Sequence, residues 1–210
     1  MKIVPGILTS DMTDFDQKVE LVKELVEWVH IDMQDGEFID HSTRDIRKFP
    51  DAVLHGLGAE AHLMTYEPDK YLEDCSRMGF KRVIIHLSAM ENPSAVLRRI
   101  KALHMQPAIA LNPEDSVDSL EPYLDLIEAV LIMTINPGPQ GQKIMPELLE
   151  KSRELRMYEP DIIIGVDGGV KLGNIEMVAE YPLDYAEVGS GLWKTDDVAA
   201  TLGSLRAKLM

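Results

Sequence analysis

The chain has 210 residues, of which 45% are apolar, enough for a domain with a sizeable core. Its net charge of −15 argues against nucleic-acid binding, because a phosphate backbone would be repelled over the whole surface. No stretch approaches the roughly 20 apolar residues of a membrane span, and the first residues lack a signal peptide's apolar run, so we expect a cytoplasmic protein that does not bind membranes.

Eight short apolar runs alternate with amphipathic segments along the chain. The runs predicted as strands are Ile3–Leu8, Trp28–Met33, Gly58–Met64, Arg82–Leu87, Pro107–Leu111, Ala129–Thr134, Ile162–Val166 and Tyr185–Val188. The segments predicted as helices are Asp14–Glu27, Pro68–Met78, Pro93–His104, Pro146–Tyr158, Leu172–Glu180 and Asp196–Lys208. Eight strands alternating with helices favour a single α/β domain over residues 1–210, a (β/α)8 TIM barrel. An open doubly wound sheet is the competing architecture.

One polar segment interrupts this alternation for longer than any other. It runs from Gln34 to Asp51 and is rich in charge. Loops that follow strands carry the functional groups of barrels, so we interpret it as an active-site lid. The single cysteine, Cys75, excludes an internal disulfide and lies in a predicted helix, where we expect it to pack.

Four side chains at strand ends have the chemistry of a metal site. The strand Trp28–Met33 carries His30 and Asp32, which alternation places on the same side. His62 stands near the end of another strand, and Asp167 follows a third. Two imidazoles and two carboxylates at one end of a barrel suit a divalent transition metal with nitrogen and oxygen ligands.

The same residues indicate a reaction type. A cation beside a sugar's carbonyl and neighbouring hydroxyl would stabilise the negative charge of an enediolate. Asp32 and Asp167 come from distant strands, so they can flank a substrate that lies across the mouth of the barrel. Carboxylates on opposite faces of a carbon can remove a proton from one side and return one to the other, as an epimerase requires.

Three glycine-containing loops are candidates for phosphate binding. They are Asn136–Gln142 after the sixth strand, Gly168–Gly169 after the seventh and Gly189–Gly191 after the eighth. Glycine lets the backbone approach an anion closely, and the loops after strands 7 and 8 form the usual phosphate site of TIM barrels. We therefore expect a sugar phosphate as the ligand.

Several motifs together resemble the ribulose-phosphate 3-epimerase family. They are Lys2–Leu8, His30–Asp32 with Asp35–Gly36, Ala61–Met64, Leu111–Pro113, Met133–Gly138, Gly141–Gln142 and Val166–Gly169. The resemblance implies a TIM barrel that binds zinc, iron, manganese or cobalt through His30, Asp32, His62 and Asp167. It further implies that Asp32 and Asp167 are the acid–base pair at carbon 3 of a ketopentose 5-phosphate, in an enzyme that forms homo-oligomers.

The resemblance and the glycine loops together predict the lining of a substrate pocket. The predicted substrate-binding residues are Gly6, Gln34, Met64, Met133, Gly138, Gly141, Gln142, Gly168, Gly169, Gly189 and Ser190. Met64 and Met133 match the family's thioethers beside the enediolate. His86 matches a strand-end histidine of the family, to which we assign no role.

Some of these positions depart from the family pattern. Gly6 stands where the family usually has a serine, which removes a hydroxyl that faces the ligand, and Gln34 replaces a third thioether. The lid gains carboxylates at Glu37 and Asp40. In the loop after the sixth strand, Pro139 lacks an N–H donor, and a glutamine follows it where glycine is usual.

These departures leave more than one function open. The first is conversion of ribulose 5-phosphate to xylulose 5-phosphate, and the second is epimerisation of a ketohexose 6-phosphate. A paralogue that binds phosphosugars without turnover is an alternative from another class, although the complete ligand set weighs against it. Aldol or decarboxylase chemistry is disfavoured, because no lysine stands at a predicted strand end.

Overall fold

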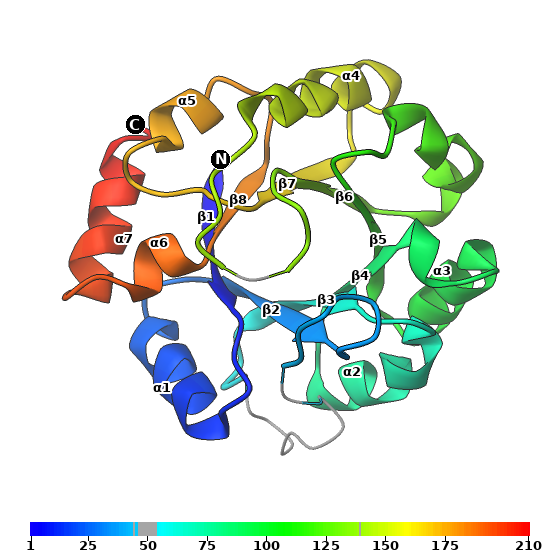
Figure 1. Ribbon diagram of the computed structural model, residues 1–210, viewed down its shortest axis with the longest axis horizontal. Helices are drawn as coiled ribbons and strands as arrows, with labels where there is room; N and C mark the ends of the chain where they lie inside the picture. Colours follow the sequence, from blue (N-terminus) through cyan, green and yellow to red (C-terminus); the bar gives the residue numbers. More distant parts are fainter. Residues whose placement is uncertain (44, 46–53, 139) are drawn as a thin grey trace.

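Eight parallel strands close into a barrel in the computed structural model, which describes residues 1–43, 45, 54–138 and 140–210 (Figure 1). The strands are β1 (Lys2–Ile7), β2 (Trp28–Gln34), β3 (Gly58–Met64), β4 (Arg82–His86), β5 (Gln106–Leu111), β6 (Ala129–Met133), β7 (Ile163–Asp167) and β8 (Tyr185–Val188). Each strand pairs with its neighbours in sequence, and β1 pairs with β8. The predicted TIM barrel is confirmed, and the open sheet was wrong.

The predicted strand ends were shifted by one residue at several places. Two of these shifts affect the site, because β2 runs on to Gln34 and β7 runs on to Asp167. Gln34 pairs with Met64 on β3, and Asp167 pairs with Met133 on β6. Backbone pairing therefore extends one residue beyond the apolar run in each strand. Asp167 is therefore the last residue of its strand, and Gln34 belongs to a strand instead of the predicted lid. The rest of that segment includes residues 44 and 46–51, which lie outside the described residues, as does Pro139.

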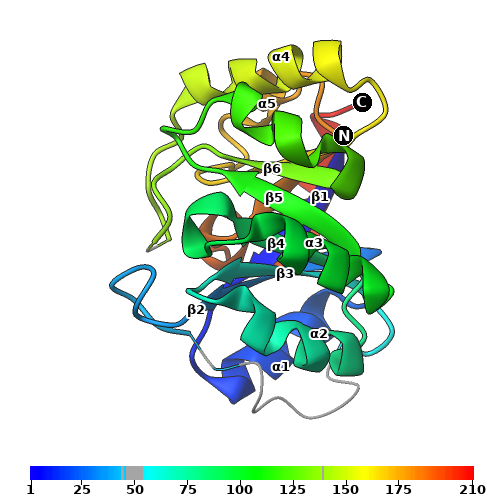
Figure 2. The ribbon, with the colours of Figure 1, turned by 90° about the vertical axis from the view of Figure 1, so that its right-hand side faces the viewer.

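Helices form the outer ring of the molecule, seen end-on in Figure 1 and from the side in Figure 2. The α-helices are α1 (Met12–Val22), α2 (Leu72–Met78), α3 (Pro93–Ala102), α4 (Glu150–Tyr158), α5 (Ile175–Val178), α6 (Ser190–Trp193) and α7 (Val198–Ala207). Four 3₁₀ helices among the described residues span Pro68–Tyr71, Leu87–Ala89, Val117–Leu126 and Pro146–Leu149. Among the described residues, no helix is both long and apolar enough to cross a bilayer.

Capping and 3₁₀ turns account for the differences at the starts of three predicted helices. The first helix begins at Met12, two residues early, because the carboxylate of Asp11 accepts a hydrogen bond from the backbone N–H of Thr13 at 2.8 Å. Two predicted helices open instead with a 3₁₀ turn that starts at Pro68 or Pro146. Helix α6 was not predicted, because its glycine-containing sequence was interpreted as a loop.

Two apolar layers hold the barrel together. The larger lies between the outer face of the strands and the helices, and Phe15, Val19 and Val22 of α1 contribute to it. The smaller fills the barrel interior with a few small or branched side chains, including Ala108, Ala110 and Leu131. The interior is thus a packed core, and polar groups lie above and below it along the barrel axis.

Cys75 provides a test of the packing in the outer layer. Its side chain is fully buried in α2, and burial raises the pKa of the thiol to about 12 because a thiolate loses its hydration there. At pH 8 we expect the folded protein to react with Ellman's reagent roughly 10³-fold more slowly than protein unfolded in guanidinium chloride. Equal rates in the folded and unfolded protein would contradict this packing.

Candidate metal-dependent active site

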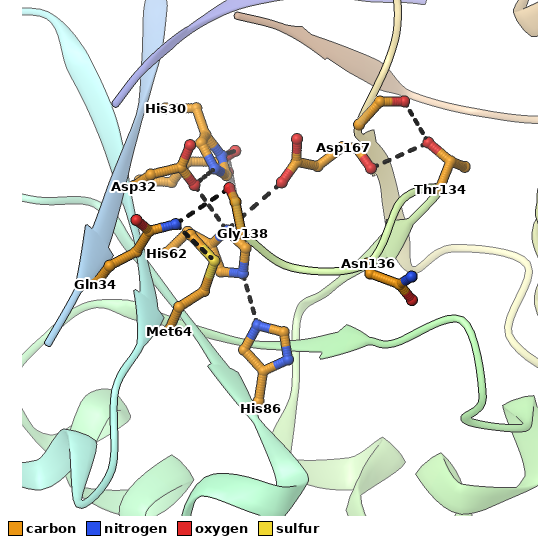
Figure 3. A network of polar contacts seen from close by, with 12 residues as sticks. His30, Asp32, Gln34, His62, Met64, His86, Thr134, Asn136, Gly138 and Asp167 are labelled. Atoms are coloured by element: carbon orange, nitrogen blue, oxygen red, sulfur yellow. Dashed lines mark hydrogen bonds and ion pairs between the residues drawn. The ribbon is translucent and has the colours of Figure 1, made fainter. Parts of the chain in front are cut away.

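Two histidines and two aspartates meet inside the mouth of the barrel (Figure 3). His30 Nε2 lies 3.1 Å from Asp32 Oδ1, and His62 Nδ1 lies 3.0 Å from the same oxygen. Asp167 Oδ2 is 3.6 Å from His62 Nδ1. One ligand atom from each residue lies within 4.8 Å of those of the other three. The structure therefore brings together the four residues predicted as metal ligands.

Strand alternation and register produce this arrangement. His30 and Asp32 are two residues apart on β2, so both side chains point into the barrel. Asp32 pairs with His62 on β3, which sets their side chains next to each other. Asp167 reaches the cluster from β7, which β1 and β8 separate from β2 in the closed sheet.

Hydrogen bonds from Glu60 and His86 orient the two histidines. His30 Nδ1 lies 2.7 Å from Glu60 Oε1, which leaves its Nε2 facing the cluster. His62 Nε2 lies 2.8 Å from His86 Nε2, which leaves its Nδ1 facing the cluster. Such contacts select the tautomer and fix the ring of a metal-binding histidine. This gives His86 a structural place beside the site.

The environment shifts the pKa values of the two aspartates in opposite directions. Burial opposes ionisation of Asp32, but His30 and His62 outweigh it and hold the pKa of that carboxyl below its ordinary value. For Asp167, burial and the negative charge of Asp32 raise the pKa above its ordinary value. Two carboxyl groups with divergent proton affinities are the arrangement expected of an acid–base pair.

The cluster fits a divalent cation by its donor chemistry and spacing. Tetrahedral ligand atoms about 2.1 Å from a metal lie about 3.4 Å from one another. The three separations of 3.0, 3.1 and 3.6 Å lie close to that value. Burial of four polar groups in one place is costly unless a cation compensates the two carboxylates. The residues present can therefore hold a divalent metal, whose identity the geometry does not select.

A pocket opens from this cluster toward the loops after β6, β7 and β8. Predicted substrate-binding residues that line it are Met64, Met133, Gly138, Gly141, Gly168, Gly169, Gly189 and Ser190, alongside Asp32 and Asp167. Gly168 has a φ of +118°, and a Cβ there would lie 2.5 Å from the side chain of Ile135. Only glycine tolerates both the positive φ and the lack of space for a Cβ. Gly168 therefore allows the chain to turn sharply after Asp167, next to the pocket.

Comparison with known proteins identifies the family of this barrel. The sequence model described as the ribulose-phosphate 3 epimerase family matches residues 2–193. The chain belongs to this family. It is therefore an isomerase of the epimerase class.

Curated proteins of the ribulose-phosphate 3-epimerase family match nearly the full chain. The cytoplasmic isoform of ribulose-phosphate 3-epimerase from Oryza sativa subsp. japonica is 31% identical, covering 98% of this chain and 92% of its own. The enzyme from Synechocystis sp. is 32% identical, with 97% and 92% covered. That from Methanocaldococcus jannaschii is 30% identical, with 98% and 90% covered.

Solved structures outside the ribulose-phosphate 3-epimerase family share the fold. A structure of KGPDC from Streptococcus mutans in complex with D-R5P superposes with a TM-score of 0.76 at 11% identity, covering 99% of this chain and 96% of its own. A structure of 3-hexulose-6-phosphate synthase gives a TM-score of 0.72 at 18% identity, with 100% of both chains covered. These likenesses support the barrel architecture alone.

Three of the predicted substrate-binding residues lie beside the pocket of this epimerase instead of on its lining. Gln34 is buried, and its Nε2 donates to the carbonyl of Gly138 at 3.4 Å, which links β2 to the loop after β6. Gln142 donates to the carbonyl of Asn136 at 2.9 Å and thereby braces that loop. Gly6 lies under another side chain, that of Glu187. Their contacts with substrate stay predictions.

Two buried glutamates of this family member, Glu60 and Glu187, were not predicted from the sequence. Glu187 on β8 lines the pocket, and burial and Asp167 raise the pKa of its carboxyl well above the ordinary value. Glu60 on β3 forms a hydrogen bond with Nδ1 of His30, the ring nitrogen that faces away from the cluster. The two-residue period of a strand could have identified them as inward-facing. Glu60 stands two residues before His62, and Glu187 stands two residues before the glycine of the eighth loop. A charged residue at an inward position of a barrel strand indicates a polar partner inside.

Proposed function

We propose that the protein inverts carbon 3 of a ketose phosphate, interconverting ribulose 5-phosphate and xylulose 5-phosphate. The observation that carries the proposal is the pair Asp32 and Asp167, which come from two non-neighbouring strands, β2 and β7, and belong to a cluster that can hold a cation. The family supports this substrate, since its curated relatives are named for ribulose phosphate. The complete ligand set argues against a paralogue that only binds phosphosugars.

Each aspartate would serve one face of the substrate. One carboxylate takes the proton from carbon 3, and the electron pair of that C–H bond moves toward the carbonyl at carbon 2 to give an enediolate. The other aspartate, protonated, delivers its proton to carbon 3 from the opposite face. A divalent cation, when bound by His30, Asp32, His62 and Asp167, supplies positive charge that stabilises the negative charge on the sugar oxygens. The net change is inversion, with no redox partner required.

The far end of the pocket suits the phosphate. Gly168 and Gly169 have positive φ values of +118° and +71°, and Gly189 and Ser190 lie on the adjacent loop. Backbone without side chains can come close to phosphate oxygens there. The thioethers of Met64 and Met133 line the walls between cluster and loops, where they would contact the carbon skeleton.

The buried side-chain oxygen of Gln34 would offer the substrate a further hydrogen-bond acceptor. Among the described residues its Oε1 has no hydrogen-bond partner. Unpartnered buried oxygens are uncommon in folded proteins, so a ligand hydroxyl is a natural donor to it. Zinc, iron, manganese and cobalt all suit the ligand set, and self-association and a cytoplasmic location stay predictions from the resemblance and the composition.

Deuterium incorporation tests the proposed reaction. We expect ribulose 5-phosphate incubated with the protein and metal in D₂O to yield xylulose 5-phosphate with deuterium at carbon 3, detected by NMR and mass spectrometry. Dialysis against a chelator should abolish this exchange, and zinc, iron(II), manganese or cobalt should restore it. A parallel incubation with ketohexose 6-phosphates compares the alternative substrate. No exchange into ribulose 5-phosphate with any of the four metals would reject the proposal.

A further inference from the structure

Glu187 places a third carboxyl group in the substrate pocket, beyond the two that the proposed reaction uses. Its side chain is buried, with 4% of the residue exposed, and it lines the pocket together with Asp32 and Asp167. The strand β8 directs it inward, two residues after Tyr185 of the interior core. No step of the proposed proton transfer needs this group, so its position calls for another explanation.

Gly6 makes room for this carboxyl group. A Cβ built on Gly6 would lie 1.4 Å from Oε1 of Glu187 and 2.3 Å from its Cδ, so any side chain at residue 6 would occupy the same space. The backbone of Gly6 is held in turn by Trp193, whose Nε1 donates to the Gly6 carbonyl at 2.5 Å. Gly6 and Glu187 are therefore a matched pair, because the small residue on β1 accommodates the long acidic residue on β8.

The carboxyl group lies between the two ends of the pocket. On one side it interacts with the carboxyl of Asp167. On the other, its Oε1 would lie 3.0 Å from a Cβ built on Gly189, in the loop assigned above to the phosphate. The position of the substrate rests on the proposed function. A ketose 5-phosphate would lie with carbon 3 at the two aspartates and with its phosphate at Gly168–Gly169 and Gly189–Ser190. Its carbon 4 would then lie next to Glu187.

We propose that Glu187, whose carboxyl group occupies the space that Gly6 leaves free, determines substrate specificity by accepting a hydrogen bond from the hydroxyl on carbon 4 of the ketose phosphate. A carboxyl oxygen can accept from a hydroxyl in either protonation state. The contact supplies the polar partner that residue 6 itself does not offer. It makes the pocket selective for ketoses that carry a hydroxyl next to the epimerised carbon.

Removing one atom from the substrate and one side chain from the protein isolates this contact. We compare kcat/KM for ribulose 5-phosphate and its 4-deoxy analogue, using the metal-loaded wild type, Glu187→Ala and Glu187→Gln. The wild type is expected to lose about 10- to 100-fold on the 4-deoxy analogue, the range of one hydrogen bond in a buried site. Glu187→Ala is expected to lose a similar factor on ribulose 5-phosphate and to discriminate little between the two substrates. Glu187→Gln keeps an oxygen acceptor and should retain most of the discrimination.

Variants at residue 6 separate this role from simple packing. Gly6→Ala should displace the carboxyl of Glu187, lower the melting temperature and reduce discrimination between the two substrates. The double variant Gly6→Ala/Glu187→Ala should recover the melting temperature while its discrimination stays low. Glu128→Ala, at an exposed glutamate, is the control and should match the wild type in both measurements.

The outcomes distinguish this proposal from the proposed function. If wild type and Glu187→Ala lose the same factor on the 4-deoxy analogue, the hydroxyl contact is wrong although the epimerase assignment stands. In that case, a fall in kcat/KM by the same factor on both substrates would show that Glu187 only positions Asp167. If the wild type exchanges no deuterium into ribulose 5-phosphate at all, the proposed function fails first, and this specificity role fails with it.

Discussion

Asp167→Asn is expected to reduce kcat for carbon 3 epimerisation by about 10³-fold or more, the upper part of the range for a general acid or base. The amide can neither accept nor deliver the proton on its face of the substrate. Asp32 remains on the other face, so the variant should still exchange deuterium into whichever of the two epimers presents its proton to Asp32. Incubating ribulose 5-phosphate and xylulose 5-phosphate separately in D₂O, each at saturating metal, measures both effects.

The matched control for this variant is Asp118→Asn, which changes an exposed aspartate away from the pocket and should leave both rates unchanged. Metal content, measured on the same samples, separates loss of the cation from loss of the acid–base group, because Asp167 serves both purposes in our proposal. Equal exchange into both epimers by the metal-loaded variant would show that the two faces are not divided between the two aspartates.

Arg82→Met is expected to lower the free energy of unfolding by about 3–5 kcal/mol, because it removes the guanidinium that pairs with the buried Glu60. Arg82 donates to Glu60 Oε2 at 2.8 Å, and Tyr185 donates to the same oxygen at 3.0 Å. The side chains of Arg82 and Glu60 are 7% and 1% exposed, so the pair is largely shielded from solvent in the folded protein. Urea unfolding of chelator-treated wild type and variant measures the difference without a contribution from metal.

An exposed ion pair supplies the comparison for this stability effect. Arg99 pairs with Glu73 at the surface, and Arg99→Met should change the free energy of unfolding by only about 0–1 kcal/mol. The double variant Glu60→Leu/Arg82→Met removes both buried charges and should recover much of the loss caused by Arg82→Met alone. If Arg82→Met and Arg99→Met unfold at the same urea concentration, the buried pair does not stabilise the barrel.

Periodicity in the sequence favoured a barrel over an open sheet and placed the four candidate ligands at strand ends. Eight apolar runs separated by helical segments leave few ways to bury every strand on both faces, and closure of the sheet is one of them. Because a strand turns alternate side chains to opposite faces, His30 and Asp32 had to share a side wherever the strand lay. Equivalent strand ends then place His62 and Asp167 at the same mouth.

Contacts between strands far apart in the sequence could not be predicted in this way. Gly6 and Glu187 are 181 positions apart, and their shared space exists only because β8 pairs with β1 to close the barrel. The shift of β7 to include Asp167 likewise depends on its pairing with Met133, which extends beyond the apolar run.

The sequence by itself determined the alternating elements, the inward side of each strand and the chemistry of the four ligands, because these follow from local periodicity and residue type. The tertiary structure alone decided that the sheet closes, that Glu60 and His86 support the two histidines, and that Glu187 fills the space over Gly6. The physical reason is that side-chain direction is a local property of a strand, whereas the partner it meets depends on the register of strands brought together only by folding.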